Sequence, residues 1–564
     1  MVKYNEYKNL NYAKVGEDVL EFWKQNNIFE KSVATREGNK PFVFFEGPPS
    51  ANGTPGIHHV MARAVKDIFC RYKTLKGYQV NRKGGWDTHG LPVELQVEKE
   101  LGITKEDIGK KITVEEYNQR CRETVMRFKG QWDTLTEQMG YWVDLNNPYI
   151  TFENEYIESV WALLRRLYDK GFLYKGYTIQ PYSPGAGTGL SSHELNQPGC
   201  YKMVKDTTIV AQFEVKRITR NMFMFEHEEE KVYFLAWTTT PWTLPANTAL
   251  AVGKNIKYVK VRTYNPYTYE PKAADIPLTE YSSGDKLIPY KIVEEFEGRD
   301  LAGVEYHQLM PYVQPDKPAF RVVLGDFVTT EDGTGIVHIS PTFGADDFRV
   351  AAQNDIPALL VMDENGKPSP LVDKQGRFVK EVTDFAGMYV KNYDGQDESA
   401  ADYKPTDVLI AIKLKEEGRA FKVEKYEHTY PHCWRTDMPV LYYPLDSWFI
   451  KTTAVKDRLI ELNKTINWKP ESTGTGRFGN WLENLVDWNL SRSRYWGTPL
   501  PIWRTEDGEE EICIGSVVEL TSEIDKAVKA GVMEQFIEVP DLHRPYVDNI
   551  VLVSKSGKPM YRET

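Results

Sequence analysis

The chain has 564 residues, of which 41% are hydrophobic and 27% are charged, and its formal net charge is −11 at pH 7. This length exceeds what one hydrophobic core usually serves, so we expect two or three domains. No stretch approaches the roughly 18 to 20 apolar residues of a membrane helix. The acidic balance gives no overall attraction to nucleic acid, although local basic patches can still bind phosphates. The composition predicts a soluble globular protein with no membrane partner.

Residues 1 to 29 lack the basic and then apolar layout of a secretory signal, and they carry acids that a transit peptide avoids. Five cysteines lie far apart in the chain: Cys70, Cys121, Cys200, Cys433 and Cys513. This spacing suits a reducing compartment better than a disulfide framework. We therefore expect a cytoplasmic protein with buried or spare thiols.

From residue 40 to about 182, apolar β-like runs alternate with long helical segments, which favours a layered α/β domain with parallel strands. Between about 200 and 395 the pattern changes to short β-branched or aromatic strands separated by Gly, Pro and Asp turns. This predicts a β-rich domain inserted into the first. Helical patterns return after about residue 400. The predicted division is therefore 1–199, 200–395 and 396–564.

The first candidate site is PPSANGTPGIHH, residues 48 to 59, which lies between a β-like run at 40–47 and a helical pattern at 60–78. A helix start presents unpaired N–H groups and the positive end of its dipole, and it binds phosphate where small residues let the ligand approach. Gly53 and Gly56 give that access, and His58 and His59 could donate hydrogen bonds to a triphosphate. The alternative is a proline-rich turn whose histidines merely lie in the first helical turn.

A second candidate follows in GGWDTHGLPVE, residues 84 to 94, directly after a predicted strand at 78–83. A carboxylate at the end of a parallel strand faces the crevice where α/β sheets bind ligands. Asp87 is therefore a candidate for binding a ligand ammonium group, with His89 beside it. The alternative is that Asp87 caps the turn that follows.

Five sequence blocks together resemble the isoleucyl-tRNA synthetase family, within the class I aminoacyl-tRNA synthetases. They are EGPPSANGTPGIHH, GWDTHGLPVE, WTTTPWTLPANTALAVG, GTGIVHISPTFGADDF and DWNLSRSRYWGTPLPIW, and they span residues 46 to 503 in the family's order. Valyl-tRNA synthetase is similar overall, but its counterparts of the second and third blocks usually read differently. Valyl-tRNA synthetase is therefore the alternative within the class.

The resemblance implies an α/β fold, namely a Rossmann-type catalytic domain, here incomplete, with an inserted β-rich editing domain. It implies an enzyme of protein biosynthesis that ligates L-isoleucine to its tRNA through isoleucyl-adenylate. The ligands it implies are ATP with Mg²⁺, isoleucine and the isoleucine-accepting tRNA, and we expect a monomer. By position, the matching ATP-binding residues are Pro48, Pro49, Asn52, Gly53, Gly56, His58 and His59, of which the last three form the catalytic signature. The matching isoleucine-binding residues are Gly47, Pro48 and Asp87.

The ATP signature departs from the family pattern, which places His, a spacer, Gly and His in this order. This chain has Gly56, Ile57, His58 and His59, so only His59 matches by position. We hypothesise that the exchange is a compensated pair, in which His58 supplies a contact that Gly56 cannot and the space at Gly56 receives what His58 displaces. We expect the same exchange to alter the fit of inhibitors that mimic the adenylate.

A second, hydrolytic site is also implied. One missing methylene is worth only about 1 to 3 kcal/mol, a limit for which isoleucine against valine is the standard illustration, so misformed valyl-tRNA must be edited. The resemblance assigns His338 to the editing pocket and Asp347 to the ammonium group of the misacylated product. Hydroxyl and amide groups that could hold the terminal ribose or orient a water come from Thr238, Thr239, Thr240 and Asn247. An isolated threonine run would otherwise be read as ordinary strand.

Two further segments carry weaker predictions. Some family members hold zinc with two Cys-x-x-Cys motifs, whose matching positions here are Ser183, Ala186, Cys433 and Thr436. Three of the four ligands are absent, so we expect no structural zinc and no other metal site. The stretch SPGAGTG lacks the Lys-Ser/Thr pair of a P-loop and predicts a glycine-rich hairpin. In the fifth block, we expect Trp488 and Trp496 to pack in the core. The sequence leaves open whether Arg492 and Arg494 face a ligand or tRNA.

The family's lysine-rich Lys-Met-Ser-Lys-Ser loop and its helical anticodon-reading domain have no counterpart in the sequence. We therefore expect the N-terminal part of a longer enzyme, whose synthetic activity in this form is open. The alternatives are an aminoacyl-tRNA ester hydrolase that only edits, or a noncatalytic tRNA-binding fragment.

Overall fold

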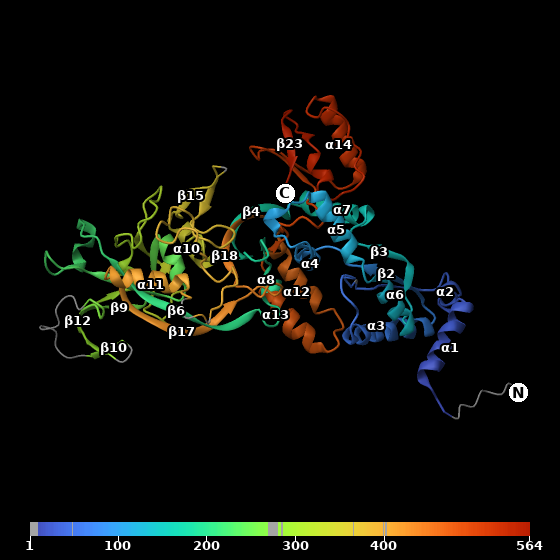
Figure 1. Cartoon of the computed structure of the whole chain (residues 1–564), viewed down its shortest axis with the longest axis horizontal. Helices are drawn as coiled ribbons and strands as arrows, with labels where there is room; N and C mark the ends of the chain where they lie inside the picture. The colour runs from blue at the N-terminus through green and yellow to red at the C-terminus, as the bar shows by residue number, and fades with distance from the viewer. Residues whose placement is uncertain are drawn as a thin grey trace. The chain divides into compact units, whose positions relative to one another are not determined.

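A computed structural model describes residues 9–47, 49–268, 280–283, 286–364, 366–398, 400 and 403–563. The chain forms two compact units, Met1–Leu173 with Arg494–Thr564, and Tyr174–Ser493 (Figure 1). The second unit contains the whole of the predicted insertion, 200–395, together with a segment on either side of it. The three-part division at residues 199 and 395 stays a prediction. No helix in the described part of the chain has the length and apolar character needed to cross a membrane.

The first unit is built on a parallel sheet with the order β1-β2-β3. Its strands are β1 (Pro41–Phe45), β2 (Gln79–Trp86) and β3 (Asp144–Ile150). β1 and β2 are in register from Pro41 opposite Gln79 to Phe45 opposite Lys83, and helix α3 (Ile57–Leu75) connects them. The predicted α/β domain with parallel strands is confirmed.

Seven more helices of this unit lie in the described residues (Figure 1). Their ends follow ordinary capping chemistry: Thr113 accepts a hydrogen bond from the backbone N–H of Glu116 at the start of α5, and Gly102 takes a left-handed φ of 65° at the end of α4. The helices are α1 (Tyr12–Gln25), α2 (Ile28–Ala34), α4 (Leu91–Leu101), α5 (Val114–Val125), α6 (Lys129–Gln138), α7 (Asn154–Asp169) and α14 (Val517–Lys529).

The last part of the unit is a small subdomain that the sequence did not lead us to expect. Its antiparallel sheet has the order β21-β20-β23-β22, and α14 packs against β22. The strands are β20 (Ile502–Thr505), β21 (Glu511–Cys513), β22 (Leu552–Val553) and β23 (Pro559–Arg562). Its core includes Trp503 and, from α7, Trp161, both fully buried. The turn-like stretch near the end of the chain connects β22 to β23.

The second unit is rich in short strands, as predicted. One sheet has the order β17-β6-β7, and another has the order β13-β8-β14, with β8 fully buried along its length. Helix α11 (Thr406–Glu416) packs against β6 and β17 (Figure 1). The strands in these two sheets are β6 (Tyr201–Glu214), β7 (Tyr233–Thr238), β8 (Ala249–Val252), β13 (Arg321–Leu324), β14 (Ile336–Ile339) and β17 (Ala420–Pro431).

The remaining elements of this unit are further short strands and helices. The other strands are β4 (Leu173–Ser183), β5 (Thr188–Gly189), β9 (Lys257–Arg262), β10 (Glu280–Ser283), β11 (Lys286–Pro289), β12 (Lys291–Glu297), β15 (Leu360–Met362), β16 (Pro368–Pro370), β18 (Leu441–Ile450) and β19 (Trp488–Asn489). The other helices are α8 (Ser192–Leu195), α9 (Gly298–Leu301), α10 (Ala345–Gln353), α12 (Lys456–Asn463) and α13 (Phe478–Glu483). β4 and β5 are antiparallel, with Ser183 opposite Thr188, so the predicted glycine-rich hairpin is confirmed.

Candidate functional sites

The PPSANGTPGIHH loop connects β1 to α3, as the sequence predicted. Pro48 lies outside the described residues. The rest of the loop is braced by the indole of Trp132 on α6, whose Nε1 donates to the Gly53 carbonyl at 2.8 Å, and by the N–H of Phe128, which donates to the Ala51 carbonyl at 3.0 Å. Ser50 donates to the side-chain oxygen of Asn52, whose amide in turn donates to Gln96 on α4 at 3.1 Å. The loop is thus held by two helices of its own unit.

The start of α3 determines which ring nitrogen of a neutral His59 carries the proton. The backbone N–H of Gly56 donates to Nδ1 of His59 at 2.9 Å, so a neutral His59 carries its proton on Nε2. Burial, followed by the neighbouring charges of His58 and Arg63, lowers the pKa of His59. The edge of the ring meets Trp132, with centroids 4.7 Å apart. The first turn of α3 therefore offers one oriented Nε2–H donor beside the positive end of the helix dipole.

His58 occupies the space beside Gly56. A Cβ atom at position 56 would lie 2.9 Å from Cε1 and 3.0 Å from Nδ1 of the His58 ring. The rings of His58 and His59 are 3.8 Å apart, and His58 is exposed. Because a side chain at position 56 would overlap this ring, the two exchanged positions share one volume. This geometry favours the compensated-pair hypothesis, which stays a hypothesis.

Asp87 directly follows β2, as predicted, and its backbone N–H donates to the Pro49 carbonyl at 3.0 Å. This bond ties the second candidate motif to the first. The residue is exposed overall, but the protein around its carboxyl desolvates it and raises its pKa, which a hydrogen bond from the backbone N–H of His89 partly offsets. A Cβ atom on Gly47 would be 3.7 Å from Nζ of Lys66. Lys66 itself pairs with the buried Glu46 at 2.7 Å.

In the second unit, five of the six predicted editing residues line one cavity of about 390 Å³. They come from segments about 100 residues apart: the end of β7, β14 and the start of α10. The backbone N–H of Trp242, next to the threonine run, donates to the buried carboxylate of Asp407 on α11, which fixes the run against that helix. The five residues are Thr238, Thr239, Thr240, His338 and Asp347.

In this cavity His338 is neutral, and only one of its two ring nitrogens has a hydrogen-bond partner among the described residues. Its Nε2 lies 2.8 Å from the hydroxyl of Thr243, and its Nδ1 is a buried atom with no hydrogen-bond partner among the described residues. Burial lowers the pKa of His338 to about 4. The unpaired nitrogen is therefore available to a ligand or a water molecule in the cavity.

Asp347 is a desolvated acid. Its Oδ2 accepts a hydrogen bond from the backbone N–H of Ser340 at 2.8 Å, and burial raises its pKa to about 7. Among the described residues, its carboxyl has no cationic partner within ion-pair distance. A cation brought by a ligand would compensate this buried charge.

The sixth predicted editing residue, Asn247, lies outside the cavity lining. It is buried, and its amide donates to the Ala249 carbonyl at 2.9 Å and accepts from the hydroxyl of Tyr306 at 2.8 Å. These bonds hold the connection between the threonine run and β8. The editing role of Asn247 stays a prediction.

The structure answers one question about the fifth block that the sequence left open, and it corrects one expectation. Arg494 does not face a ligand: its side chain is 6% exposed and pairs with Glu94 and Glu98 on α4. Arg492 pairs with Glu194 at 2.9 Å. Trp496 is buried as predicted, whereas Trp488 is 56% exposed, because it lies on the short edge strand β19.

At the positions that match the zinc ligands of some family members, Ser183 accepts a hydrogen bond from the N–H of Ala186, and Cys433 is a buried free thiol. Within the described ranges, no group of three or more His, Cys, Asp or Glu side chains could hold a metal ion. The absence of structural zinc stays a prediction.

Residues 18–542 match the family model of the class I tRNA synthetases (I, L, M and V), and the chain belongs to this family. Its fold is therefore that of a class I synthetase with a β-rich insertion. The chain is 68% identical over 587 residues to the isoleucine–tRNA ligase of Cytophaga hutchinsonii, covering 100% of this chain and 52% of that protein. It is 59% identical over 614 residues to that of Bacteroides fragilis, covering 100% of this chain and 53% of the relative, and 44% identical over 558 residues to that of Clostridium tetani, covering 98% and 48%. The chain thus spans about half the length of these curated relatives.

Proposed function

We propose that this chain belongs to an isoleucine–tRNA ligase that activates isoleucine with ATP, transfers it to tRNA and hydrolyses misformed valyl-tRNA. The observation that supports the proposal is the hydrogen bond from the backbone N–H of Asp87 to the Pro49 carbonyl, which links the loops that follow β1 and β2 at one edge of the parallel sheet. The identity to isoleucine–tRNA ligases over the whole chain supports the choice of amino acid.

In the activation step, the isoleucine carboxylate attacks the α-phosphorus of ATP, and pyrophosphate leaves with the electron pair of the broken P–O bond. Asp87 binds the substrate ammonium group, with Gly47 and Pro48 beside it. Pro49, Asn52 and Gly53 receive the nucleotide, while Gly56, His58 and the Nε2–H of His59 face the triphosphate. Mg²⁺ enters with the triphosphate and neutralises part of its charge.

In the editing step, water attacks the ester carbonyl of valyl-tRNA, and the ribose oxygen leaves with a proton, which releases valine and tRNA. Asp347 binds the ammonium group of the ester, and the free Nδ1 of His338 accepts a hydrogen bond from the product or the water. Thr238, Thr239 and Thr240 hold the terminal ribose or orient the water, and Asn247 holds the connection between this run and β8. The enzyme is cytoplasmic and monomeric, with tRNA, isoleucine and ATP as its partners.

Two assays on this chain separate the proposal from its alternatives. Isoleucine-dependent exchange of pyrophosphate into ATP tests activation, and deacylation of preformed valyl-tRNA, with isoleucyl-tRNA as the control ester, tests editing. Deacylation without exchange would indicate an editing hydrolase, and tRNA binding without either activity would indicate a noncatalytic fragment. Exchange with valine in preference to isoleucine would identify a valyl enzyme. The same exchange assay in a protein of the relatives' full length tests the complete ligase.

A further inference from the structure

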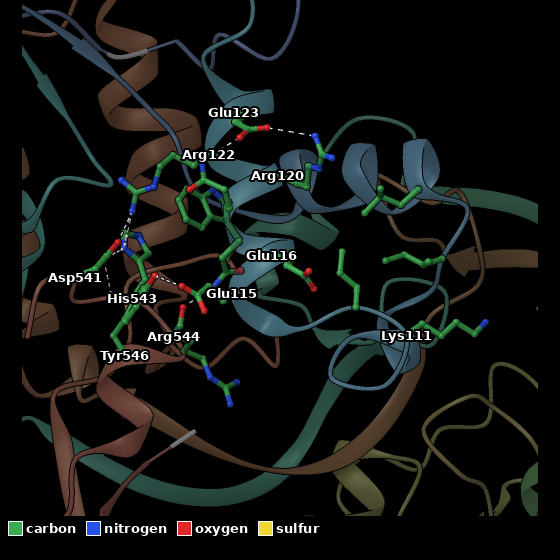
Figure 2. Close-up of a pocket in the computed structure, with 16 residues that line it drawn as sticks. Lys111, Glu115, Glu116, Arg120, Arg122, Glu123, Asp541, His543, Arg544 and Tyr546 are labelled. Carbon is green, nitrogen blue, oxygen red and sulfur yellow. Dashed lines mark hydrogen bonds and ion pairs between the residues drawn. The ribbon is translucent and has the colours of Figure 1, made fainter.

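Within the first unit, residues 540–546 are held by side chains from α5 and α7. We call this segment the strap. Asn154 on α7 accepts from the N–H of Leu542 at 3.0 Å and donates to the Pro540 carbonyl at 3.1 Å. From α5, Asn118 donates to the Arg544 carbonyl at 2.9 Å. The strap borders a cavity of about 780 Å³ beside α5, shown in Figure 2.

From the strap, a chain of polar contacts leads to the Asp87 loop. Arg122 on α5 donates to Asp541 at 2.6 Å, and Asp541 lies 2.5 Å from Nδ1 of His543 (Figure 2). On its other side, Nε2 of His543 lies 2.8 Å from Nε2 of His89. His543 is 1% exposed, and its ring stacks on Trp496 with centroids 4.7 Å apart.

The direction of these hydrogen bonds follows from the partners. Asp541 can only accept, so Nδ1 of His543 carries a proton. In neutral His543 the other nitrogen, Nε2, is then an acceptor, and His89 donates from its own Nε2–H. Burial, followed by the charges of His543 and Arg122, lowers the pKa of His89 to about 3, so His89 stays neutral. A neutral His543 is therefore a buried acceptor that fixes both the tautomer and the orientation of His89.

His89 belongs to the short loop that carries Asp87. Burial raises the pKa of the Asp87 carboxyl, and the backbone N–H of His89 lowers it. The same loop is held at Thr88, whose carbonyl accepts from Nε1 of Trp496 at 2.6 Å. His543 thus acts on the loop twice, through the side chain of His89 and by packing on Trp496. The loop that presents the ammonium anchor is consequently held by residues that lie 408 and 454 positions later in the chain.

We propose that His543 is a positioning residue for the amino acid substrate: through His89 it fixes the loop from which Asp87 binds the ammonium group. This inference rests on the proposed function. It assigns to the strap a task mainly in isoleucine binding, because the ATP loop, although tied to Asp87 through Pro49, is also braced by Trp132 and Phe128.

The test compares His543→Ala and His543→Gln with Tyr546→Phe in a protein of the relatives' full length that carries this sequence. Tyr546 is the matched control, since it lies in the same strap but donates to Glu115, away from His89. In pyrophosphate exchange we expect His543→Ala to raise the KM for isoleucine about tenfold and the KM for ATP less than about twofold, the effect of one lost buried hydrogen bond. His543→Gln retains an acceptor and should recover part of the loss, and Tyr546→Phe should behave as wild type.

Hydrogen exchange in the 564-residue chain gives a readout that does not depend on activity. The amide of Thr88 should exchange faster in His543→Ala, while the amides of Trp132 and Phe128 keep their wild-type rates. Equal shifts of both KM values, or an unchanged isoleucine KM with unchanged exchange at Thr88, would overturn the inference. If the wild-type protein shows no isoleucine-dependent pyrophosphate exchange, it is the proposed function that fails, and faster hydrogen exchange at Thr88 would still support the positioning role.

Discussion

Replacing Asp347 by Asn should stabilise the second unit and at the same time impair editing. The carboxyl of Asp347 is desolvated and has a pKa of about 7, against an ordinary value of 3.8. The folded state therefore holds the proton more tightly than the unfolded state does, and wild-type stability falls as the pH rises from about 4 to about 7. Asn remains neutral throughout this range, so the variant does not lose this stability.

The difference of about three pKa units corresponds to about 4 kcal/mol, and we halve it because Asp347 retains partial contact with solvent. We therefore expect the variant to be more stable than wild type by about 2 kcal/mol at pH 8, and by less than half of that at pH 5. Deacylation of valyl-tRNA should fall at least about tenfold, because the ammonium group loses its charged partner.

Urea unfolding of both proteins at pH 5 and pH 8 measures the stability, and deacylation at pH 8 measures the activity. Asp346→Asn is the control, since Asp346 is exposed and pairs with Arg349 at 3.0 Å, so this variant should gain no stability and keep its deacylation rate. A gain for Asp347→Asn that is equal at the two pH values, or full deacylation activity, would refute the reasoning.

Three further predictions concern the first unit. Gly56→His should impair pyrophosphate exchange because its side chain overlaps the His58 ring. The double variant Gly56→His, His58→Gly should restore exchange. If Gly56→His and His58→Gly are each harmless alone, the two sites are uncoupled. The same variants should shift the inhibition constants of adenylate mimics. Asp87→Ala should raise the KM for isoleucine more than that for ATP, and an unchanged isoleucine KM counts against its assignment. Glu94→Gln should lower the free energy of unfolding in urea by about 1.5 to 3 kcal/mol, since it removes one of the two carboxylates that pair with the buried Arg494, and an unchanged free energy of unfolding would contradict this.

The sequence alone predicted the local secondary structure around the PPSANGTPGIHH loop and Asp87. The strand, loop and helix around PPSANGTPGIHH follow from apolar spacing and from glycine and proline, which act over a few residues. The position of Asp87 after β2 follows in the same way. The gathering of the threonine run, His338 and Asp347 in one cavity was expected only through the family resemblance, because no local pattern relates β7 to α10.

What the sequence did not reveal depends on distant contacts. β21, β22 and the other strands of the small subdomain have two to four residues each, too few for a periodic pattern to register. The contact between His89 and His543 joins positions 454 residues apart. Arg494 resembles an exposed cation in the sequence, and its burial depends on two acids that α4 supplies from about 400 residues earlier.

The arrangement of β1 has a practical consequence for handling the protein. Within the described residues β1 pairs only with β2, so the backbone N–H and C=O groups along its other edge are open to a further strand. In the same unit, α3 packs against β2 and presents a row of exposed apolar side chains: Ile57, Met61, Val65, Ile68, Tyr72 and Leu75. An open strand edge is a template for intermolecular strand addition, and an exposed apolar helix face promotes association. A preparation of these 564 residues alone should therefore self-associate as its concentration rises, bind hydrophobic dyes and be retained by chaperones. Its activities are best measured at concentrations below the onset of self-association.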